Sequence, residues 1–345
     1  MNVSRRATLK LLVLALSATC LALIAIVVTR AIVDDSGGAK SAGPVPSALS
    51  LKTRPGEKAA TPFETASVPR VDYVIDLRSG ATTPLPDAII RSLGTSDERD
   101  LYPAWASRYA ASSDGSRLAY VGVGDEGSLQ IFIAGIDGTG VRQVTHDPRG
   151  AMFPAWSPDG TMIAYGGSEG LFVLDVATGE STRIVGAGYI QPSSPQPQFT
   201  PDGSSLLYSR RSDTHSDEVE LRTVPIDGGK STVLIGRDEG MGYAASGSLS
   251  PDGSLVTMVG NEINGPGALR FVANADGSER RIIPGGNSNP AGTWSPDGSR
   301  IVCLANFESG GGVVIVDIAT GRRSPVAKGN GAIWLDEHTL LVEVT

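Results

Sequence analysis

Cysteine and histidine are scarce in this 345-residue chain, and their scarcity excludes several kinds of site. The two cysteines, Cys20 and Cys303, are too few for a disulfide framework and form no CxxC motif. The three histidines, His146, His215 and His338, are far apart and show neither HxxxH nor HExxH spacing. The sequence therefore predicts no disulfide and gives little support to a zinc site.

Charged residues are also few, at 19% of the chain, and they are unevenly distributed. Residues 1–70 hold nine Lys or Arg and four Asp or Glu, which gives a net charge of +5. The remaining residues hold 20 basic and 33 acidic side chains, which gives a net charge of −13. An acidic domain without a basic stripe is a poor candidate for nucleic-acid binding, and solubility is the simplest explanation of its charge.

A long apolar run occurs at the N-terminus. Three basic residues precede eighteen uncharged residues from Leu11 to Val28, a run longer than a signal-peptide core and close to the roughly 20 residues that span a bilayer. Basic residues before the run place the N-terminus inside the cell. We therefore predict a cytoplasmic tail and transmembrane signal anchor at residues 1–33, with a cleaved signal peptide as the alternative. Residues 34–70, rich in Gly, Ser, Ala and Pro, are predicted to form a flexible linker.

A Ser-Pro-Asp-Gly signature recurs after the linker, with intervals of 45, 43, 50 and 45 residues between its Asp positions. Pro presets φ, Ser and Asp form local hydrogen bonds, and Gly accepts a positive φ, so each copy predicts a tight turn between antiparallel strands. We interpret the Asp residues as caps of these turns and not as metal ligands. The copies are Ser112–Gly115 (Ser-Ser-Asp-Gly), Ser157–Gly160, Thr200–Gly203 (Thr-Pro-Asp-Gly), Ser250–Gly253 and Ser295–Gly298.

A second hairpin with an Asp-Gly or Thr-Gly turn follows each of these turns. Two hairpins in about 45 residues form a four-stranded meander of the size of one propeller blade. The repeat region opens with an unpaired second hairpin at Val71–Gly80 and closes with a degenerate first hairpin at Trp334–Val342. Joined, these two complete a blade and remove free sheet edges. The sequence thus predicts an all-β, six-bladed β-propeller at residues 71–345, with four-stranded antiparallel blades, a two-plus-two closure and a transmembrane helix before it.

Two adjacent segments carry a resemblance to a known family. Arg142-Gln-Val-Thr-His-Asp-Pro148, followed by Pro154-Ala-Trp-Ser-Pro-Asp-Gly160, closely resembles the repeat of TolB-like propellers. The resemblance covers about residues 71–345. It implies an extracytoplasmic six-bladed propeller that typically binds other proteins.

Candidate binding residues lie in the connections opposite the Ser-Pro-Asp-Gly turns. These connections are longer and more varied, and such loops on a rigid scaffold usually carry binding residues. For any single residue, a purely connecting role is the simpler expectation. A further hypothesis is that acidic residues of these loops, Asp125, Glu169, Asp213, Asp238, Glu262 and Glu308, ring the channel mouth and bind Ca²⁺; no other cofactor, metal ligand or catalytic residue is predicted. The binding candidates are His146, Asp147, Arg210, Arg211, Asp213, His215, Asp238, Glu262 and Glu308.

These observations favour a non-enzymatic scaffold that binds an unidentified extracytoplasmic protein or cell-envelope ligand. It would be a single-pass protein of the cell membrane, with the propeller on the extracytoplasmic side. The alternative is a metal-dependent propeller hydrolase, lactonase or lyase, with its site at the mouth of the central channel. The two hypotheses differ in whether several metal ligands converge at that mouth, which the sequence alone does not establish.

Overall fold

The described part of the chain lies in the second of two compact units, Glu57–Thr345. The predicted anchor and linker, residues 1–33 and 34–70, lie outside the described residues. Within the described residues, no helix is long and apolar enough to cross a membrane. The computed structural model describes residues 71–95, 102, 107–186, 197–213, 218–236, 239–262, 269–283, 292–305 and 312–344.

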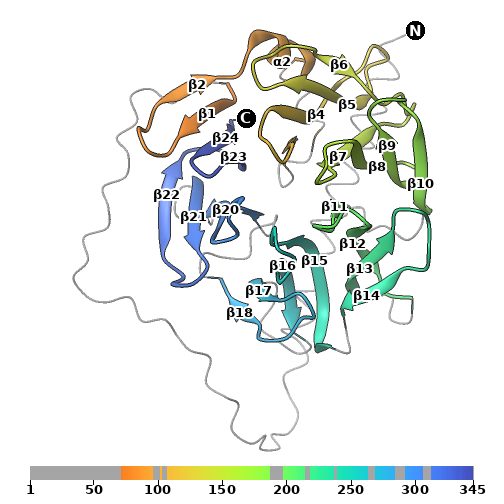
Figure 1. Ribbon diagram of the computed structural model, residues 1–345, viewed down its shortest axis with the longest axis vertical. Helices are drawn as coiled ribbons and strands as arrows, with labels where there is room; N and C mark the ends of the chain where they lie inside the picture. Colours follow the sequence, from red (N-terminus) through yellow and green to blue (C-terminus); the bar gives the residue numbers. More distant parts are fainter. Residues whose placement is uncertain are drawn as a thin grey trace, which may run out of the picture. The chain divides into compact units, whose positions relative to one another are not determined.

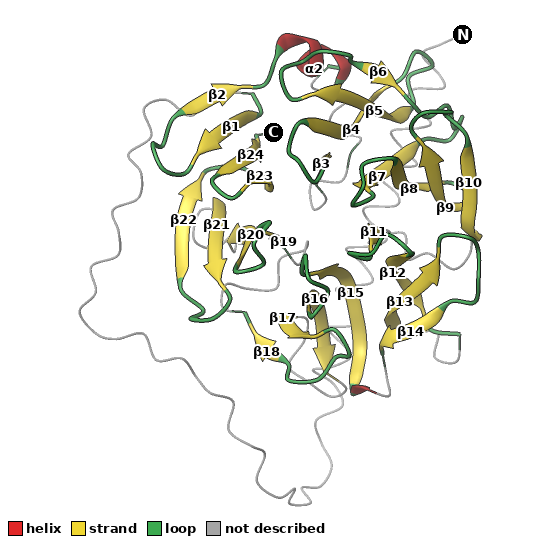
Figure 2. Cartoon of the chain, viewed as in Figure 1, coloured by secondary structure: helices red, strands yellow, loops and turns green. Residues whose placement is uncertain are grey.

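Strands form four four-stranded sheets and one eight-stranded sheet, which follow one another around a common centre (Figures 1 and 2). Strands are antiparallel within each four-stranded sheet, as the repeated hairpins predict. The first complete sheet consists of β3 (Tyr109–Ala111), β4 (Arg117–Val123), β5 (Leu129–Gly135) and β6 (Arg142–Gln143). The next consists of β7 (Ala151–Trp156), β8 (Met162–Gly167), β9 (Gly170–Asp175) and β10 (Ser181–Gly186).

The eight-stranded sheet contains two four-stranded units joined by one parallel pair, Val219 with Tyr243. Separate sheets were expected here. The short fourth strand of the first unit pairs only as far as Leu221, so the edge at Val219 stays available to the long strand that opens the next unit. The first unit is β11 (Gln198–Phe199), β12 (Ser205–Arg211), β13 (Val219–Pro225) and β14 (Thr232–Ile235). The second is β15 (Met241–Leu249), β16 (Leu255–Glu262), β17 (Leu269–Asn274) and β18 (Arg281–Ile282).

The last sheet pairs the two ends of the repeat region, which confirms the predicted closure. Tyr73 pairs with Val342, and Asp76 pairs with Thr339. This closure sheet consists of β1 (Tyr73–Asp76), β2 (Thr82–Pro84), β23 (Gly331–Asp336) and β24 (Thr339–Glu343). The sheet before it consists of β19 (Thr293–Trp294), β20 (Arg300–Ala305), β21 (Gly312–Asp317) and β22 (Arg323–Ala327).

Each Ser-Pro-Asp-Gly turn is held by its own side chains, as the copy at residues 157–160 shows. Ser157 Oγ donates to Asp159 Oδ1 at 2.6 Å, and the backbone N–H of Thr161 donates to the same oxygen at 3.0 Å. Gly160 has a φ of 68°, a conformation that glycine adopts without strain. Equivalent hydrogen bonds hold the other copies. The predicted capping role of these Asp residues is therefore confirmed.

Contacts between consecutive units close a cycle. Strand β3 contacts β7, and β7 contacts β11. The cycle continues from β12 to β15, from β15 to β19, from β19 to β23 and from β23 back to β3. Apolar clusters lie between neighbouring sheets, as where Leu171 of β9 and Phe199 of β11 share one cluster. The hydrophobic core is thus divided among the interfaces between sheets.

One short helix, α2 (Asp87–Ser92), packs on the outside of this arrangement (Figure 2). Ile89 and Leu93 are fully buried in a cluster with Tyr120 and Leu341. The hydroxyl groups of Ser92 and Tyr120 share a hydrogen bond of 2.7 Å. The helix therefore covers the junction between the closure sheet and the sheet β3–β6.

Candidate functional site

The hairpin pattern gives the domain two kinds of strand end. We call the side that carries the Ser-Pro-Asp-Gly turns the turn face. Because strands alternate in direction, connections such as residues 124–128 and 146–150 lie at the opposite strand ends, which we call the loop face. The candidate binding residues were assigned to the loop face.

His146 and Asp147 lie in the connection between β6 and β7. The ring of His146 is exposed, and its Nδ1 lies 2.9 Å from Nε2 of Gln143. Asp147 is held through its backbone, since Gln130 Nε2 donates to its carbonyl oxygen at 2.6 Å. Its carboxylate accepts the backbone N–H of Arg149 at 2.9 Å. Asp147 therefore shapes this loop, whereas His146 remains accessible to a partner.

The structure brings Arg210 and Asp213 together as an ion pair at the end of β12. Asp213 is half exposed, whereas the Arg210 side chain is largely buried. Arg211 ends the same strand and is exposed. Glu262 ends β16 in a separate connection, and its Oε1 lies 3.8 Å from Nε of Arg280. Three candidates, His215, Asp238 and Glu308, lie outside the described residues.

Two features bear on the enzyme hypothesis. The segment Gly166–Gly170 fits a Gly-x-Ser-x-Gly pattern, but it forms the tight connection between the antiparallel strands β8 and β9. It is therefore not the strand-to-helix elbow that activates a hydrolase serine. Among the residues that the structure describes, no group of three or more His, Cys, Asp or Glu is placed to hold a metal ion.

A buried carboxylate, Asp72, joins the two ends of the domain near the loop face. It is only 3% exposed and immediately precedes β1. Tyr109 Oη of β3 donates to Asp72 Oδ2 at 2.6 Å, and the backbone N–H of Val344 donates to Oδ1 at 2.7 Å. Burial and the nearby Asp72 charge raise the pKa of Tyr109 well above its usual range. Asp72 thus links the first strand, the last strand and the first complete sheet.

A second buried carboxylate, Glu343, lies at the end of β24. Ser107 Oγ donates to its Oε1 at 2.6 Å, and the backbone N–H of Arg108 lies 3.2 Å from the same oxygen. Removal from water raises the pKa of Glu343 to about 7, although the Ser107 hydrogen bond acts in the opposite direction. The Arg108 guanidinium packs over the Tyr102 ring, 5.2 Å from its centroid. The closure therefore contains a carboxyl group that titrates near neutral pH.

A buried arginine lies between two further sheets. Arg270 of β17 is fully buried, and its Nη1 donates to Sγ of Cys303 on β20 at 3.2 Å. Burial lowers the pKa of Arg270 and raises that of the Cys303 thiol. Cys303 is a free cysteine. The hydrogen bond from Arg270 makes Cys303 part of a polar contact between sheets.

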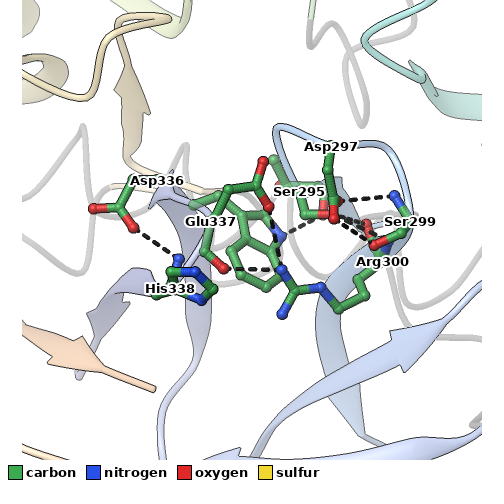
Figure 3. Close-up of polar contacts among 9 residues, drawn as sticks. Ser295, Asp297, Ser299, Arg300, Asp336, Glu337 and His338 are labelled. Atoms are coloured by element: carbon green, nitrogen blue, oxygen red, sulfur yellow. Dashed lines mark hydrogen bonds and ion pairs between the residues drawn. The ribbon is translucent and has the colours of Figure 1, made fainter. Parts of the chain in front are cut away.

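On the turn face, two arginines fasten one sheet to the next. Arg300 extends from β20 to the closure sheet, where its Nη2 donates to the carbonyl oxygen of Glu337 at 2.8 Å (Figure 3). Its Cζ lies 4.8 Å from the centre of the Trp334 ring. Arg117 of β4 makes the same contacts with the next sheet, at 2.9 Å from Gly160 O and 4.5 Å from the Trp156 ring centre. Both tryptophans are buried.

We expect Arg300→Met to lower the free energy of unfolding by about 1–2 kcal/mol. The change removes a cation–π contact of about 0.5–2 kcal/mol and a charge-assisted hydrogen bond. Both interactions are weakened because the arginine side chain is partly exposed to solvent. Urea denaturation of the full chain measures the effect. The control is Arg322→Met, an exposed arginine of an outer turn, expected to stay within about 0.5 kcal/mol of wild type. Equal losses in both variants would contradict the role of Arg300.

Sequence reasoning did not identify Asp72, Glu343 or Arg270. Their contacts join residues that are 33 to 272 positions apart, which no local pattern encodes. A signal for the two arginines of the turn face was present, because Arg117 and Arg300 occupy the same position after their turns. The unit after Arg117 has Trp156 directly before its turn, and the unit after Arg300 has Trp334 before the degenerate turn at the closure.

Comparison with known proteins matches residues 91–334 to the model of the TolB β-propeller domain. The chain belongs to the TolB β-propeller domain family. The match confirms the resemblance read from the repeats. It includes every Ser-Pro-Asp-Gly turn and most of the sheets described above.

Individual relatives of this TolB-type propeller match over shorter stretches. The Tol-Pal system protein TolB of Francisella tularensis subsp. mediasiatica is 35% identical over 118 residues, which is 31% of this chain and 26% of that protein. The protein of the same name from Methylococcus capsulatus is 38% identical over 76 residues, 20% of this chain and 18% of its own length. The crystal structure of TolB from Acinetobacter baumannii has a TM-score of 0.53 and 16% identity, over 69% of this chain and 54% of that one. The last likeness is one of fold alone.

Proposed function

We propose that this protein is a membrane-anchored, extracytoplasmic, six-bladed β-propeller that acts as a non-enzymatic scaffold for protein binding. Counting the two halves of the eight-stranded sheet separately gives six four-stranded units. The anchor is the apolar run from Leu11 to Val28, and the partner is a protein of the cell envelope. Its binding surface is the loop face.

The observation that carries this proposal is the contrast between the two faces of one closed scaffold. On the turn face, polar side chains are used within and between the repeated turns. The loop face instead presents irregular connections with exposed polar side chains, among them His146, Arg211 and Glu262. Variable loops on a rigid frame are suited to recognition.

The family supports a protein partner. The matched relatives are named as proteins of the Tol-Pal system, so a role in an envelope assembly is consistent with the shared propeller domain. The matches span about a quarter or less of those proteins, so the identity of the partner does not follow from them. The net charge of −13 over residues 71–345 favours a partner with basic groups.

A site-specific crosslinking experiment tests the proposal. A photoreactive amino acid at Arg211, on the loop face, is expected to capture one envelope protein in intact cells. The matched control places the same group at Thr182, an exposed residue of the outer strand β10, and is expected to capture no specific partner. Equal crosslinking yields from both positions would exclude a loop-face scaffold. Metal-dependent turnover by the purified chain, without any captured protein, would favour the enzyme alternative.

A further inference from the structure

One fixed position after the Ser-Pro-Asp-Gly turns lies at a groove between neighbouring turns. This groove position, five residues after the first residue of the turn, holds Arg117 and Arg300 in the two arginine contacts described above. At the same position in another unit, Met162 packs against the cluster that contains Phe199 of the following unit. In these three units the residue at the groove position contacts the next unit.

In the unit that begins with the turn Ser250–Gly253, this position is taken by an apolar side chain, Leu255. It packs against the cluster that contains Trp294, the counterpart of Trp156 and Trp334. Trp294 is buried, at 6% exposure. A hollow of ≈ 330 Å³ remains between the turns, lined by Pro251, Asp252, Leu255, Pro296, Asp297 and Gly298.

Two carboxylates on the rim of this hollow give it a negative charge. Hydrogen bonds from Ser250 and Ser254 lower the pKa of Asp252 to about 2. For Asp297, desolvation acts in the opposite direction, but hydrogen bonds from Ser295 and Ser299 still lower the pKa to about 2. Both groups are therefore ionised at any physiological pH. Arg300, whose charge also contributes to the lowered pKa of Asp297, contacts Glu337 of the closure sheet.

We propose that this hollow between the two turns is a docking site for an arginine side chain of a protein partner. The guest guanidinium donates to the carbonyl oxygen of Gly298, as Arg117 donates to that of the equivalent Gly160. The aliphatic part of the side chain lies between Pro251 and Pro296, and Asp252 and Asp297 balance its charge. This site lies on the turn face and goes beyond the proposed loop-face function.

Arginine suits the hollow better than lysine does. The guanidinium is planar, is weakly hydrated and donates in several directions, so it can contact a backbone carbonyl and a carboxylate together. An ammonium group is a compact, strongly hydrated charge and loses more on leaving water. The chain itself uses arginine in both grooves where a cation is present.

A peptide titration followed by NMR tests the proposal on the full-length chain. Blocked Gly-Arg-Gly is expected to shift the amide signals of Gly253 and Gly298 and to bind at least about fivefold more tightly than Gly-Lys-Gly. The citrulline peptide, which lacks the charge, is expected to produce no shift. Equal affinities of the arginine and lysine peptides, or shifts confined to other residues, would overturn the proposal.

The variant Leu255→Arg is designed to fill the hollow with an arginine side chain of the chain itself. The new side chain should reproduce the Arg300 contact, raise the melting temperature by about 2–4 °C, and weaken peptide binding at least about tenfold. The control is Leu255→Met, whose side chain is unbranched and uncharged. Its affinity for the peptide should stay within about twofold of that of wild type. If Leu255→Arg folds and still binds the peptide as wild type does, the hollow is not the site.

A gain-of-function variant covers the case in which Leu255→Arg does not fold. Arg117→Leu places a leucine at the same position of another groove, beside Gly160 and Trp156, where Ser113 stands in place of Pro251. It should raise the peptide stoichiometry by one, with new shifts at Gly160. An unchanged stoichiometry in the folded variant would count against the proposal. Because no loop-face residue is altered, these results do not depend on the loop-face crosslinking.

Discussion

Asp72→Ala is expected to lower the free energy of unfolding by about 2–5 kcal/mol. The reason is that two buried donors, the Tyr109 hydroxyl and the backbone N–H of Val344, lose the carboxylate that accepts their hydrogen bonds. An unsatisfied buried donor costs about 1–3 kcal/mol, and hydrogen bonds to a charged group are among the stronger ones. Denaturation by urea, followed by circular dichroism, measures the loss.

A double-mutant cycle separates this explanation from a loss of packing. Tyr109→Phe removes one of the stranded donors, so adding it to Asp72→Ala should recover part of the lost stability. The control Asp87→Ala removes an exposed carboxylate of α2 and is expected to change stability by less than about 0.5 kcal/mol. Strict additivity of Asp72→Ala and Tyr109→Phe would show that the hydrogen bond does not hold the closure.

The second large effect is a pH dependence that Glu343 imposes on stability. Its pKa is about 7 in the folded chain and 4.5 for an unperturbed glutamate. For a carboxyl group whose folded-state pKa is raised, the folded state is favoured while the group is protonated. Stability is therefore greatest below about pH 4.5 with respect to this group, and it declines by about 3 kcal/mol as pH rises through 7.

Glu343→Gln should remove this decline. The glutamine carbonyl still accepts from Ser107 and from the backbone of Arg108, but the side chain carries no charge at any pH. Unfolding free energies at pH 5, 6, 7 and 8 are expected to be flatter for the variant than for wild type, and higher than wild type at pH 8. Glu180→Gln, in an exposed outer turn, serves as the control and should keep the wild-type slope. Parallel slopes for wild type and Glu343→Gln would contradict the assignment.

The capping Asp residues affect stability in a lower pH range than Glu343 does. The capping Asp residues of four turns have pKa values lowered to about 2, because Ser or Thr side chains and backbone N–H groups donate to them. A lowered carboxyl pKa contributes stability above the unfolded value, and that contribution is lost as pH falls from about 4 towards 2. The interval between pH 5 and 8 therefore reports on Glu343 without interference from the turns.

Much of the fold could be predicted because its information is local and repeated. The turn at residues 157–160 contains every group that holds it, from the Ser157 hydroxyl to the positive φ of Gly160. The pairing of the first hairpin with the last also followed from the sequence, since each was one half of a repeating unit. The parallel pair of Val219 with Tyr243 did not follow, because it depends on where the short strand β14 ends.

The candidate site was predicted less completely. Placing the binding residues in the loops opposite the turns required only the direction of the strands, and His146, Arg211 and Glu262 do lie at those ends as exposed side chains. The sequence did not show which loop residues hold the loops in place. Asp147, for example, is held by a hydrogen bond from Gln130, which lies seventeen positions away on β5. Whether the loop residues bind a partner stays a prediction.

The sequence by itself determined the repeating unit, its turns and the pairing of its ends, because hydrogen bonds within a few residues and alternation along a strand are properties of short segments. Only the tertiary structure decided which polar groups are buried and which grooves are filled. Asp72, Glu343 and Arg270 gain their roles from neighbours distant in sequence, and Leu255 lines a hollow between two turns. Burial and distance across sheets depend on the whole ring of packed units, so no single repeat carries them.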